Sequence, residues 1–331
     1  MENATPTSPG AQSSISVSDL SKWIEKWFNR CQVRQFSDQA IANHRIVLEK
    51  LLWYLDDRKL HECGEDELMG FLAYVTNGHI DARGRWGNPR LREKASPGTV
   101  QTYYSRLHTF FAYIVEKGVI AANPMDGVTT QINRNEQIDP LSLDQIDRLL
   151  AIAKKSRHPR RDTAILLFLL DTGVRATELC NIRIRDIDLS ENTCEILGKG
   201  NKPRLISFGD STKRAIFQYL KEDSRDTEDV LFASDRGERA GGALTRSGLR
   251  QLVQRLGRAA NIKATRCSPH TFRHTFAIQW LREGGTQIAL MKMLGHSDSK
   301  MTQRYVKLSD ADVATQHVLY SPVDRMRDRN R

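Results

Sequence analysis

The segment Ser268–Ala277, SPHTFRHTFA, places two histidines and an arginine within ten residues. Ser268 is of the type that caps a helix start by accepting a backbone N–H, and Pro269 suits the first helical position. His270 and Arg273, three residues apart, would then project from one face of the first turn. A helix N-terminus attracts anions, and a guanidinium can bind two phosphate or carboxylate oxygens at once. The segment therefore predicts an anion site.

The overall charge indicates that this anion is a polymer. The 331-residue chain contains 50 Lys and Arg against 40 Asp and Glu, which leaves a formal net charge of +10 and a pI near 9.4. Such an excess raises the local concentration of nucleic acid by long-range attraction. The hydrophobic fraction of 39% is typical of a soluble globular protein, and the length allows two ordinary domains.

Three other segments of the C-terminal half place cationic or nucleophilic side chains beside helix or turn signals. In LDTGVRATEL, Arg175 lies between the end of an apolar helix and Thr177, which is of a capping type. In LGKGNKPRL, Lys199 lies between two glycines at a predicted hairpin tip. In MLGHSDSKMTQRYVKL, His296 follows a helix-ending glycine and precedes Tyr305 by nine residues.

Each of these residues also has a structural interpretation when it is taken singly. A tyrosine on a helix face usually packs, and an arginine at a helix start is usually a surface ion pair. His270 and His274 could form a zinc pair, but a pair without a third ligand is a poor metal site, so we interpret His274 as structural. The order Arg, Lys, His-x-x-Arg, His and Tyr, at separations of 24, 71, 3, 23 and 9 residues, favours a common function instead.

This order and spacing resembles the tyrosine recombinase, or phage integrase, family, and in particular its two-domain Xer-like site-specific recombinases. The resemblance implies a mainly α fold, with a helical core-binding domain and an α+β catalytic domain that contains a small antiparallel β-sheet. It implies a site-specific DNA recombinase or integrase that works in a synaptic tetramer, for mobile-element integration and excision or for dimer resolution. The implied partners are double-stranded DNA with paired inverted core sites and further copies of this chain, and the sequence specifies no accessory protein.

The resemblance also assigns a role to each of the six residues. Tyr305 would attack the scissile phosphate and form a 3′-phosphotyrosyl link. Arg175 and Arg273 would clamp the non-bridging oxygens, Lys199 would protonate the leaving oxygen, and the two histidines of the set would support the phosphate and proton transfers. This assignment agrees with the chemistry, because a phosphorane gathers negative charge that preorganised cations stabilise.

Neither a metal nor a nucleotide cofactor is expected in the chemical step. The sequence contains no H-E-x-x-H, EF-hand or G-x-x-x-x-G-K-[ST] motif. The five cysteines are an odd, scattered number without a C-x-x-C pair, so they indicate neither a disulfide framework nor a structural zinc site.

Two other functions stay open at this point. A type IB topoisomerase-like enzyme would use similar residues and the same covalent link, but it would relax supercoils as a monomer. A non-catalytic DNA-binding module would be attractive only if one of the six residues were absent. The two-domain size and the segment that follows Tyr305 favour recombination.

The residue composition and the apolar periodicity change along the chain. Residues 1–16 have the Ser/Pro/Gly composition of a disordered leader, and apolar residues at helical spacing predict four helices within 17–122, the expected DNA-binding domain. Residues 123–140 lack periodicity and predict the interdomain linker. Residues 141–308 combine helices with strands and form the expected catalytic domain. Residues 309–331 predict a C-terminal helix and tail that contacts another protomer, with docking in cis as the alternative.

Individual helix starts are predicted at Ser or Thr residues that precede apolar-periodic segments. These are Ser18, Ser37, Ser142, Thr245, Ser268 and Thr286, with further starts at about Ser211 and near Ser309. Gly173 and Gly295 are predicted to end helices. Alternation between Asp186 and Phe208 predicts the antiparallel sheet.

The N-terminal sequence gives no sign of export or membrane insertion. The segment MENATPTSPGAQSSISV is polar, and no apolar run approaches the ~18 residues of a membrane span. We therefore expect a cytoplasmic, nucleoid-associated protein. Because the helical pattern begins directly after the leader, the sequence disfavours the additional arm-site domain of lambda-type integrases.

The segment GHIDARGRWGNPRLREKASPG, between the third and fourth predicted helices, is rich in Arg, Lys and Gly. It is either a solvated surface loop or a loop that follows the DNA backbone, and both interpretations stay open. The candidate DNA-binding side chains of this loop and of the hairpin after Lys199 are Arg83, Arg85, Arg90, Arg92, Lys94, Lys202 and Arg204.

Overall fold

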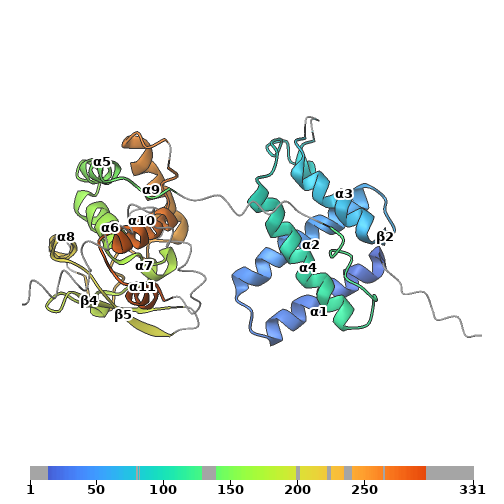
Figure 1. Ribbon diagram of the computed structural model, residues 1–331, viewed down its shortest axis with the longest axis horizontal. Helices are drawn as coiled ribbons and strands as arrows, with labels where there is room; N and C mark the ends of the chain where they lie inside the picture. Colours follow the sequence, from blue (N-terminus) through green and yellow to red (C-terminus); the bar gives the residue numbers. More distant parts are fainter. Residues whose placement is uncertain are drawn as a thin grey trace, which may run out of the picture. The chain divides into compact units, whose positions relative to one another are not determined.

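The chain forms two compact units in the computed structural model, divided between residues 136 and 137 (Figure 1). The division lies within the segment for which a linker is predicted. The structure describes residues 14–79, 81, 83–128, 139–198, 202–221, 225–234, 241–263 and 265–295. Three predicted site residues, Lys199, His296 and Tyr305, lie outside this described part, as do residues 1–13 of the predicted leader and all of 309–331.

The first unit is built from helices, with short connections at 34–37 and 58–64 and a longer loop at 77–96. Within its described residues the helices are α1 (Val17–Val33), α2 (Asp38–Asp57), α3 (Glu65–Thr76) and α4 (Pro97–Glu116). Serine side chains cap three of them, because Ser16, Ser37 and Ser96 each accept a hydrogen bond from the backbone N–H three residues on.

The core of the first unit is aromatic as well as aliphatic. Trp27 on α1, Leu48 on α2, Phe71 on α3 and Phe110 on α4 are buried in one cluster. The four helices contact one another in pairs around this cluster, so their apolar faces account for the predicted helical spacing.

The start of the first unit differs from the sequence prediction. Strand β1 (Ile15–Ser16) pairs antiparallel with β2 (Glu62–Cys63), a two-stranded sheet that the sequence did not predict. The predicted disordered leader, residues 1–16, thus includes the ordered strand Ile15–Ser16, in which the apolar Ile15 is buried. The predicted N-cap Ser18 is wrong for a related reason: the chain leaves β1 at Ser16, whose Oγ accepts the N–H of Asp19 at 3.2 Å.

The second unit combines helices with one small sheet. Its described helices are α5 (Leu143–Ala153), α6 (Pro159–Thr172), α7 (Ala176–Asn181), α8 (Asp210–Leu220), α9 (Arg246–Ala259), α10 (Pro269–Arg282) and α11 (Gln287–Leu294). The sheet has the antiparallel order β3 (Ile187–Asp188), β4 (Thr193–Leu197) and β5 (Pro203–Ser207). The prediction of a mainly α fold with a small antiparallel sheet in the C-terminal half is confirmed.

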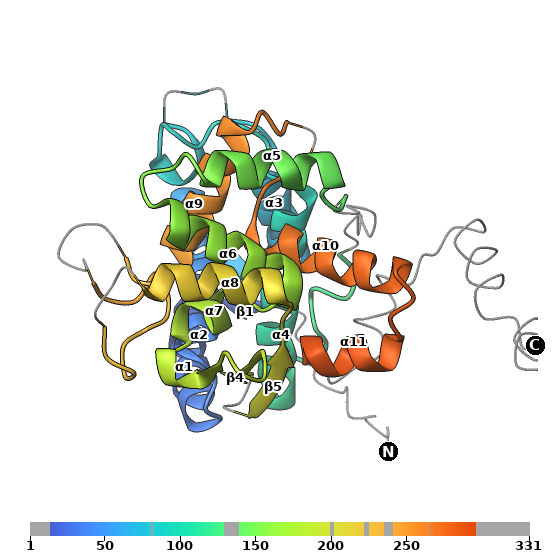
Figure 2. The ribbon, with the colours of Figure 1, turned by 90° about the vertical axis from the view of Figure 1, so that its left-hand side faces the viewer.

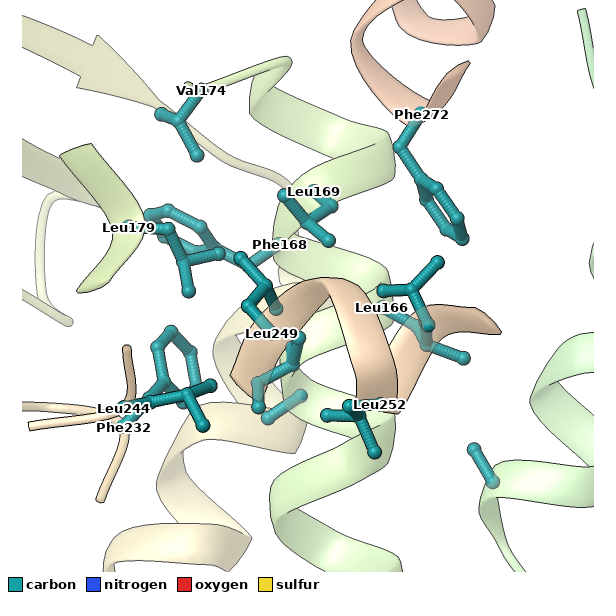
Figure 3. Packing of buried hydrophobic residues seen from close by; sticks show 14 of the residues in the cluster. Leu166, Phe168, Leu169, Val174, Leu179, Phe232, Leu244, Leu249, Leu252 and Phe272 are labelled. Carbon is teal, nitrogen blue, oxygen red and sulfur yellow. The ribbon is translucent and has the colours of Figure 1, made fainter. Parts of the chain in front are cut away.

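Helix α6 is the centre of the second unit. It contacts α5, α8 and α10, and its side chains Phe168 and Leu169 belong to one buried cluster with Leu249 of α9 and Phe272 of α10 (Figure 3). An all-round apolar sequence predicts such a central helix. Complete burial of each of these side chains contributes about 1.5–3 kcal/mol, so the position of the C-terminal end of α6 is firmly fixed.

Two glycines end the helices that border the site. Gly173 follows α6 with φ 59°, and a Cβ there would lie 2.4 Å from a ring carbon of Phe276 on α10. Gly295 follows α11 with φ 62°. Both predicted helix ends are confirmed, and a left-handed backbone conformation explains why glycine occupies each. In contrast, Thr177 does not cap α7, because the N-cap residue is Arg175.

Helices α10 and α11 lie side by side at one end of the second unit, with β5 next to α11 (Figure 2). Of the described residues of the predicted site, Arg175 is the N-cap residue of α7, and His270 and Arg273 lie near the start of α10. None of the helices in the described part of the chain is long and apolar enough to span a membrane.

Candidate active site

Arg175 occupies the turn between α6 and α7. Its backbone N–H donates to Glu178 Oε2 at 2.8 Å, which is the N3 half of a capping box. Its Nη1 donates to Glu178 Oε1 at 2.9 Å, and its Nη2 donates to the carbonyl of Gly295 at 3.4 Å. The side chain keeps 33% of its surface exposed, so the guanidinium is oriented by the protein and still accessible to an anion.

Glu178 is the acceptor at the centre of this arrangement. Its side chain is 4% exposed, and both carboxylate oxygens also accept from Arg204 of β5, at 2.8 and 2.9 Å. Burial opposes ionisation of this carboxyl, but hydrogen bonds from Arg204 and Arg175 outweigh it and lower the pKa of Glu178. The carboxylate is therefore ionised at neutral pH and holds two guanidinium groups in fixed directions.

Arg273 of α10 is 4% exposed and links two helix ends. Its Nη1 donates to the carbonyl of Gly173 and its Nη2 donates to the carbonyl of Leu294, both at 2.8 Å. The carbonyls at a helix C-terminus carry partial negative charge, so they stabilise the cation and fix its plane. Arg175 and Arg273 thus bind the carbonyls of the consecutive residues Gly295 and Leu294.

The first turn of α10 is as the sequence predicts. Ser268 Oγ accepts the N–H of Thr271 at 3.2 Å, and Pro269 is in the first turn. His270 is exposed while Arg273, one turn later on the same side, is buried. His274 is buried, and among the described residues no group of three or more His, Cys, Asp or Glu could hold a metal.

The geometry brings together Arg175 and Arg273, two of the three described residues of the predicted set, and His270 precedes Arg273 by three residues on α10. The ends of α6, α7 and α11 meet at one place, and Arg273 reaches it from α10. Two of the other three residues adjoin it in sequence, since Lys199 follows the described Gly198 and His296 follows the described Gly295, whereas Tyr305 comes nine residues after His296. Two restrained guanidinium groups beside a helix end can bind the oxygens of a phosphate without reorganisation, which favours phosphoryl chemistry.

Sequence comparison identifies the family to which these residues belong. The profile described as the phage integrase family matches residues 140–312. Tyrosine recombinase XerC of Anoxybacillus flavithermus is 32% identical over 286 residues, which cover 83% of this chain and 89% of the relative. This chain belongs to the phage integrase family of tyrosine recombinases. Tyrosine recombinase XerD of Oceanobacillus iheyensis is also similar, with 28% identity over 311 residues, 90% of this chain and 98% of the relative.

Solved recombinase structures share the fold. The Tn1549 transposon integrase in complex with transposon right end DNA matches with a TM-score of 0.69 at 18% identity, covering 92% of this chain and 98% of that chain. XerH site-specific recombinase bound to palindromic difH substrate matches with a TM-score of 0.65 at 21% identity, covering 93% and 85%. At these identities the likeness establishes the two-domain tyrosine recombinase architecture.

Sequence reasoning missed Glu178, the residue that orients Arg175 in this tyrosine recombinase. One local signal was present, because a glutamate three residues after a helix start is the N3 position of a capping box. The second bond of Glu178, to Arg204, had no such signal, since the two residues are 26 positions apart on different elements.

The candidate DNA-binding residues differ in how the structure uses them. Arg83, Arg90, Arg92 and Lys94 of the loop between α3 and α4, and Lys202 of the hairpin, are exposed. Arg85 and Arg204 instead have intramolecular partners. Arg85 is 8% exposed, and its Nη2 donates to the carbonyls of Asn77 and Glu93 at 3.0 and 2.6 Å, so it closes the loop on itself.

Proposed function

We propose that this tyrosine recombinase cleaves and rejoins DNA strands at a specific site through a 3′-phosphotyrosyl intermediate. The observation that carries the proposal is the pair of guanidinium groups, Arg175 and Arg273, bound to the carbonyls that directly precede His296. Catalysis of phosphoryl transfer depends mainly on such preorganised positive charge.

In the proposed reaction Tyr305 attacks the scissile phosphate. A bond forms between its phenolic oxygen and phosphorus, the bond from phosphorus to the 5′ oxygen breaks, and Lys199 gives a proton to that oxygen. Arg175 and Arg273 stabilise the charge on the non-bridging oxygens, and His270 and His296 support the phosphate and proton transfers. The phosphotyrosyl ester conserves the energy of the broken bond, so a 5′-hydroxyl can rejoin the strand without an external energy source.

The proposed DNA contacts follow the exposed cations. Arg83, Arg90, Arg92 and Lys94 form one group in the first unit, and Lys202 adds a charge near the site. Such contacts supply affinity through counterion release. Arg85 and Arg204 are not included, because Arg85 closes its own loop and the bidentate pair with the Glu178 carboxylate offsets the charge of Arg204. Protein oxygens also accept from Arg175 and Arg273, and the phosphate role proposed for these two rests on their places in the six-residue signature.

The proposed assembly is a tetramer on paired inverted core sites, at the nucleoid. The segment 309–331 would contact a neighbouring protomer, a role that lies outside the described residues. The structures of XerH and of the Tn1549 integrase are complexes with DNA, which supports a DNA substrate for this relative of the same fold.

A type IB topoisomerase-like activity is the alternative, and one experiment separates the two. The core site is first located by footprinting the protein on DNA that flanks its own gene. Supercoiled plasmids with two, one or no copies of that site are then incubated with the full-length protein, with and without EDTA. We expect recombinant products from the two-site plasmid alone, at the same yield with EDTA. Relaxation of all three plasmids without recombinants would favour the topoisomerase, and loss of activity in EDTA would contradict the metal-free chemistry.

A further inference from the structure

We propose that Arg204 is a positioning residue for the phosphate site rather than a DNA contact. It joins α7, β5 and α11, the three elements that adjoin Arg175, Lys199 and His296 in sequence. The inference rests on the proposed function and adds to it a residue outside the six-residue signature.

The guanidinium of Arg204 uses both of its edges within the protein. Its Nη1 and Nη2 donate to the two oxygens of Glu178 at 2.8 and 2.9 Å, a bidentate pair. Its Nε donates to the carbonyl of Met293 in the last turn of α11 at 3.0 Å. The side chain is 15% exposed. One planar group therefore fixes β5 to both α7 and α11.

Each of these partners leads directly to a residue of the signature. Glu178 orients Arg175 through two hydrogen bonds, from the backbone N–H and from the guanidinium. Met293 lies three positions before His296 in the sequence, and β5 is the strand that follows the hairpin of Lys199.

Two glycines show how closely the chain packs on this guanidinium. A Cβ on Gly198 would lie 2.9 Å from Arg204 Nη1, and a Cβ on Gly295 would lie 2.9 Å from the same atom. Real Cβ atoms are rarely so close, so the backbone of both residues rests against Arg204. Gly198 directly precedes Lys199 and Gly295 directly precedes His296. The Arg204 guanidinium thus packs against the backbone of both Gly198 and Gly295.

The chemistry of the contacts explains why arginine is needed there. A planar fork can satisfy a carboxylate with one edge while its Nε binds a carbonyl in the same plane. A lysine ammonium would keep the charge but could not span Glu178 and Met293 in fixed directions. The negative carboxylate also offsets the charge of Arg204, which lowers its attraction for DNA phosphate relative to the exposed Lys202.

The test compares Arg204→Met and Arg204→Lys with the wild type and with a matched control, Arg214→Met. Arg214 is an exposed residue of α8 with a long, 3.4 Å hydrogen bond to Ser211, so its replacement removes the same charge and a similar chain. Covalent adduct formation is followed in a single turnover on a nicked suicide substrate at saturating DNA. We expect both Arg204 variants to slow cleavage roughly 10²-fold, the usual effect of misplacing reacting groups by about 1 Å. We expect the control to cleave like the wild type, and DNA affinity to stay unchanged in all variants.

A second substrate distinguishes positioning of the phosphate clamp from general damage. A methylphosphonate at the scissile position lacks the negative charge that Arg175 and Arg273 stabilise. If Arg204 acts through the clamp, the rate loss in Arg204→Met should shrink at least about tenfold on this substrate, because clamp stabilisation of roughly 10²–10³ is no longer required. A variant that is merely less folded would lose the same factor on both substrates, and thermal unfolding of each variant provides a parallel check.

Four outcomes would overturn the inference. These are wild-type cleavage by Arg204→Met, recovery of the rate in Arg204→Lys, an equal loss on both substrates, and weaker DNA binding with normal cleavage at saturation. The last result would make Arg204 a DNA contact. A wild-type protein that forms no adduct would overturn the proposed function as a whole, whereas a wild-type adduct with an unaffected Arg204→Met would overturn this inference alone.

Discussion

Each unit of this protein buries an arginine against backbone carbonyls, but the two arginines do different work. Arg85 in the first unit binds the carbonyls of Asn77 and Glu93, eight residues away on either side, and so closes a local loop. Arg273 in the second unit binds carbonyls 100 and 21 residues away and joins the ends of α6 and α11. One guanidinium shapes a segment, and the other holds separate elements at a fixed distance.

This difference shows how a charge becomes useful for chemistry. Phosphoryl transfer needs cations whose directions do not change as negative charge develops. A loop arginine such as Arg85 donates its hydrogen bonds to carbonyls of its own segment, so only its exposed neighbours are proposed to contact DNA. In the second unit, Arg175, Arg204 and Arg273 all bind carbonyls of the same helix end, Met293 to Gly295, so one helix end fixes the directions of all three guanidinium groups.

The largest expected effect is the loss of cleavage rate when Arg273 is replaced. Arg273→Ala should slow single-turnover cleavage by roughly 10²–10³ or more, because it removes a donor to the developing charge and also the link between Gly173 and Leu294. Arg273→Lys keeps the charge and should still be slow, since one ammonium cannot bind both carbonyls and the phosphate. Cleavage by the lysine variant at the wild-type rate would show that charge alone suffices and would remove the contrast with Arg85.

A smaller effect is expected from the replacement of Glu178, on the free energy of unfolding and on its dependence on pH. Its arginine partners lower the pKa of Glu178 below the ordinary value of 4.5. The ionised carboxylate therefore makes its full contribution to the free energy of unfolding above pH 4.5, and this contribution is lost as the pH falls through the lowered pKa. Glu178→Gln should reduce the free energy of unfolding by about 1.5–3 kcal/mol at neutral pH. This difference from the wild type should shrink on going from about pH 5 to pH 3.

A control for this prediction lies in the first unit. The pKa of Glu116 is also lowered, by its hydrogen bond to Arg30, but its carboxylate is exposed to solvent. Exposed pairs contribute little, so Glu116→Gln should leave the pH profile of unfolding nearly unchanged. Urea unfolding of both variants across this pH range measures the contrast, and equal profiles would contradict it.

The smallest expected effects are a loss of stability when Arg85 is replaced and a weaker salt dependence of DNA binding when an exposed neighbour is replaced. Arg85→Ala should lower the free energy of unfolding of the first unit by about 1–3 kcal/mol, because two carbonyls lose their donor, while cleavage at saturating DNA stays close to wild type. Arg90→Ala should leave stability unchanged and reduce the slope of log affinity against log salt by about one. Thermal unfolding and salt-dependent DNA binding measure both variants, and an identical pattern for the two would remove the distinction between loop closure and DNA contact.

Helix caps and helix ends are the features of this structure that the sequence predicts well. The caps at Ser37, Ser142, Ser268 and Thr286 and the helix end at Gly295 are confirmed. Each depends on a side chain and backbone groups within a few residues, and such interactions leave a mark in the local sequence.

The long-range restraints could not be predicted in the same way. Every residue has a carbonyl, so nothing in the sequence marks Gly173 and Leu294 as the acceptors of Arg273. The loop between α3 and α4 offers several arginines of similar type, and only folding shows that Arg85 turns inward. Likewise the pair of Arg204 with Glu178 joins a strand to a helix across 26 residues.

In the proposed function, the charges assembled in the second unit serve a transesterification at Tyr305. The most direct measurement is mass spectrometry of the adduct trapped on a nicked suicide substrate, made with the wild type and with Tyr305→Phe. We expect the wild-type DNA 3′ phosphate to be attached to Tyr305, and we expect Tyr305→Phe to bind the same DNA with normal affinity but to form no adduct. An adduct that persists in Tyr305→Phe, or a wild-type adduct on another residue such as Tyr320, would contradict it.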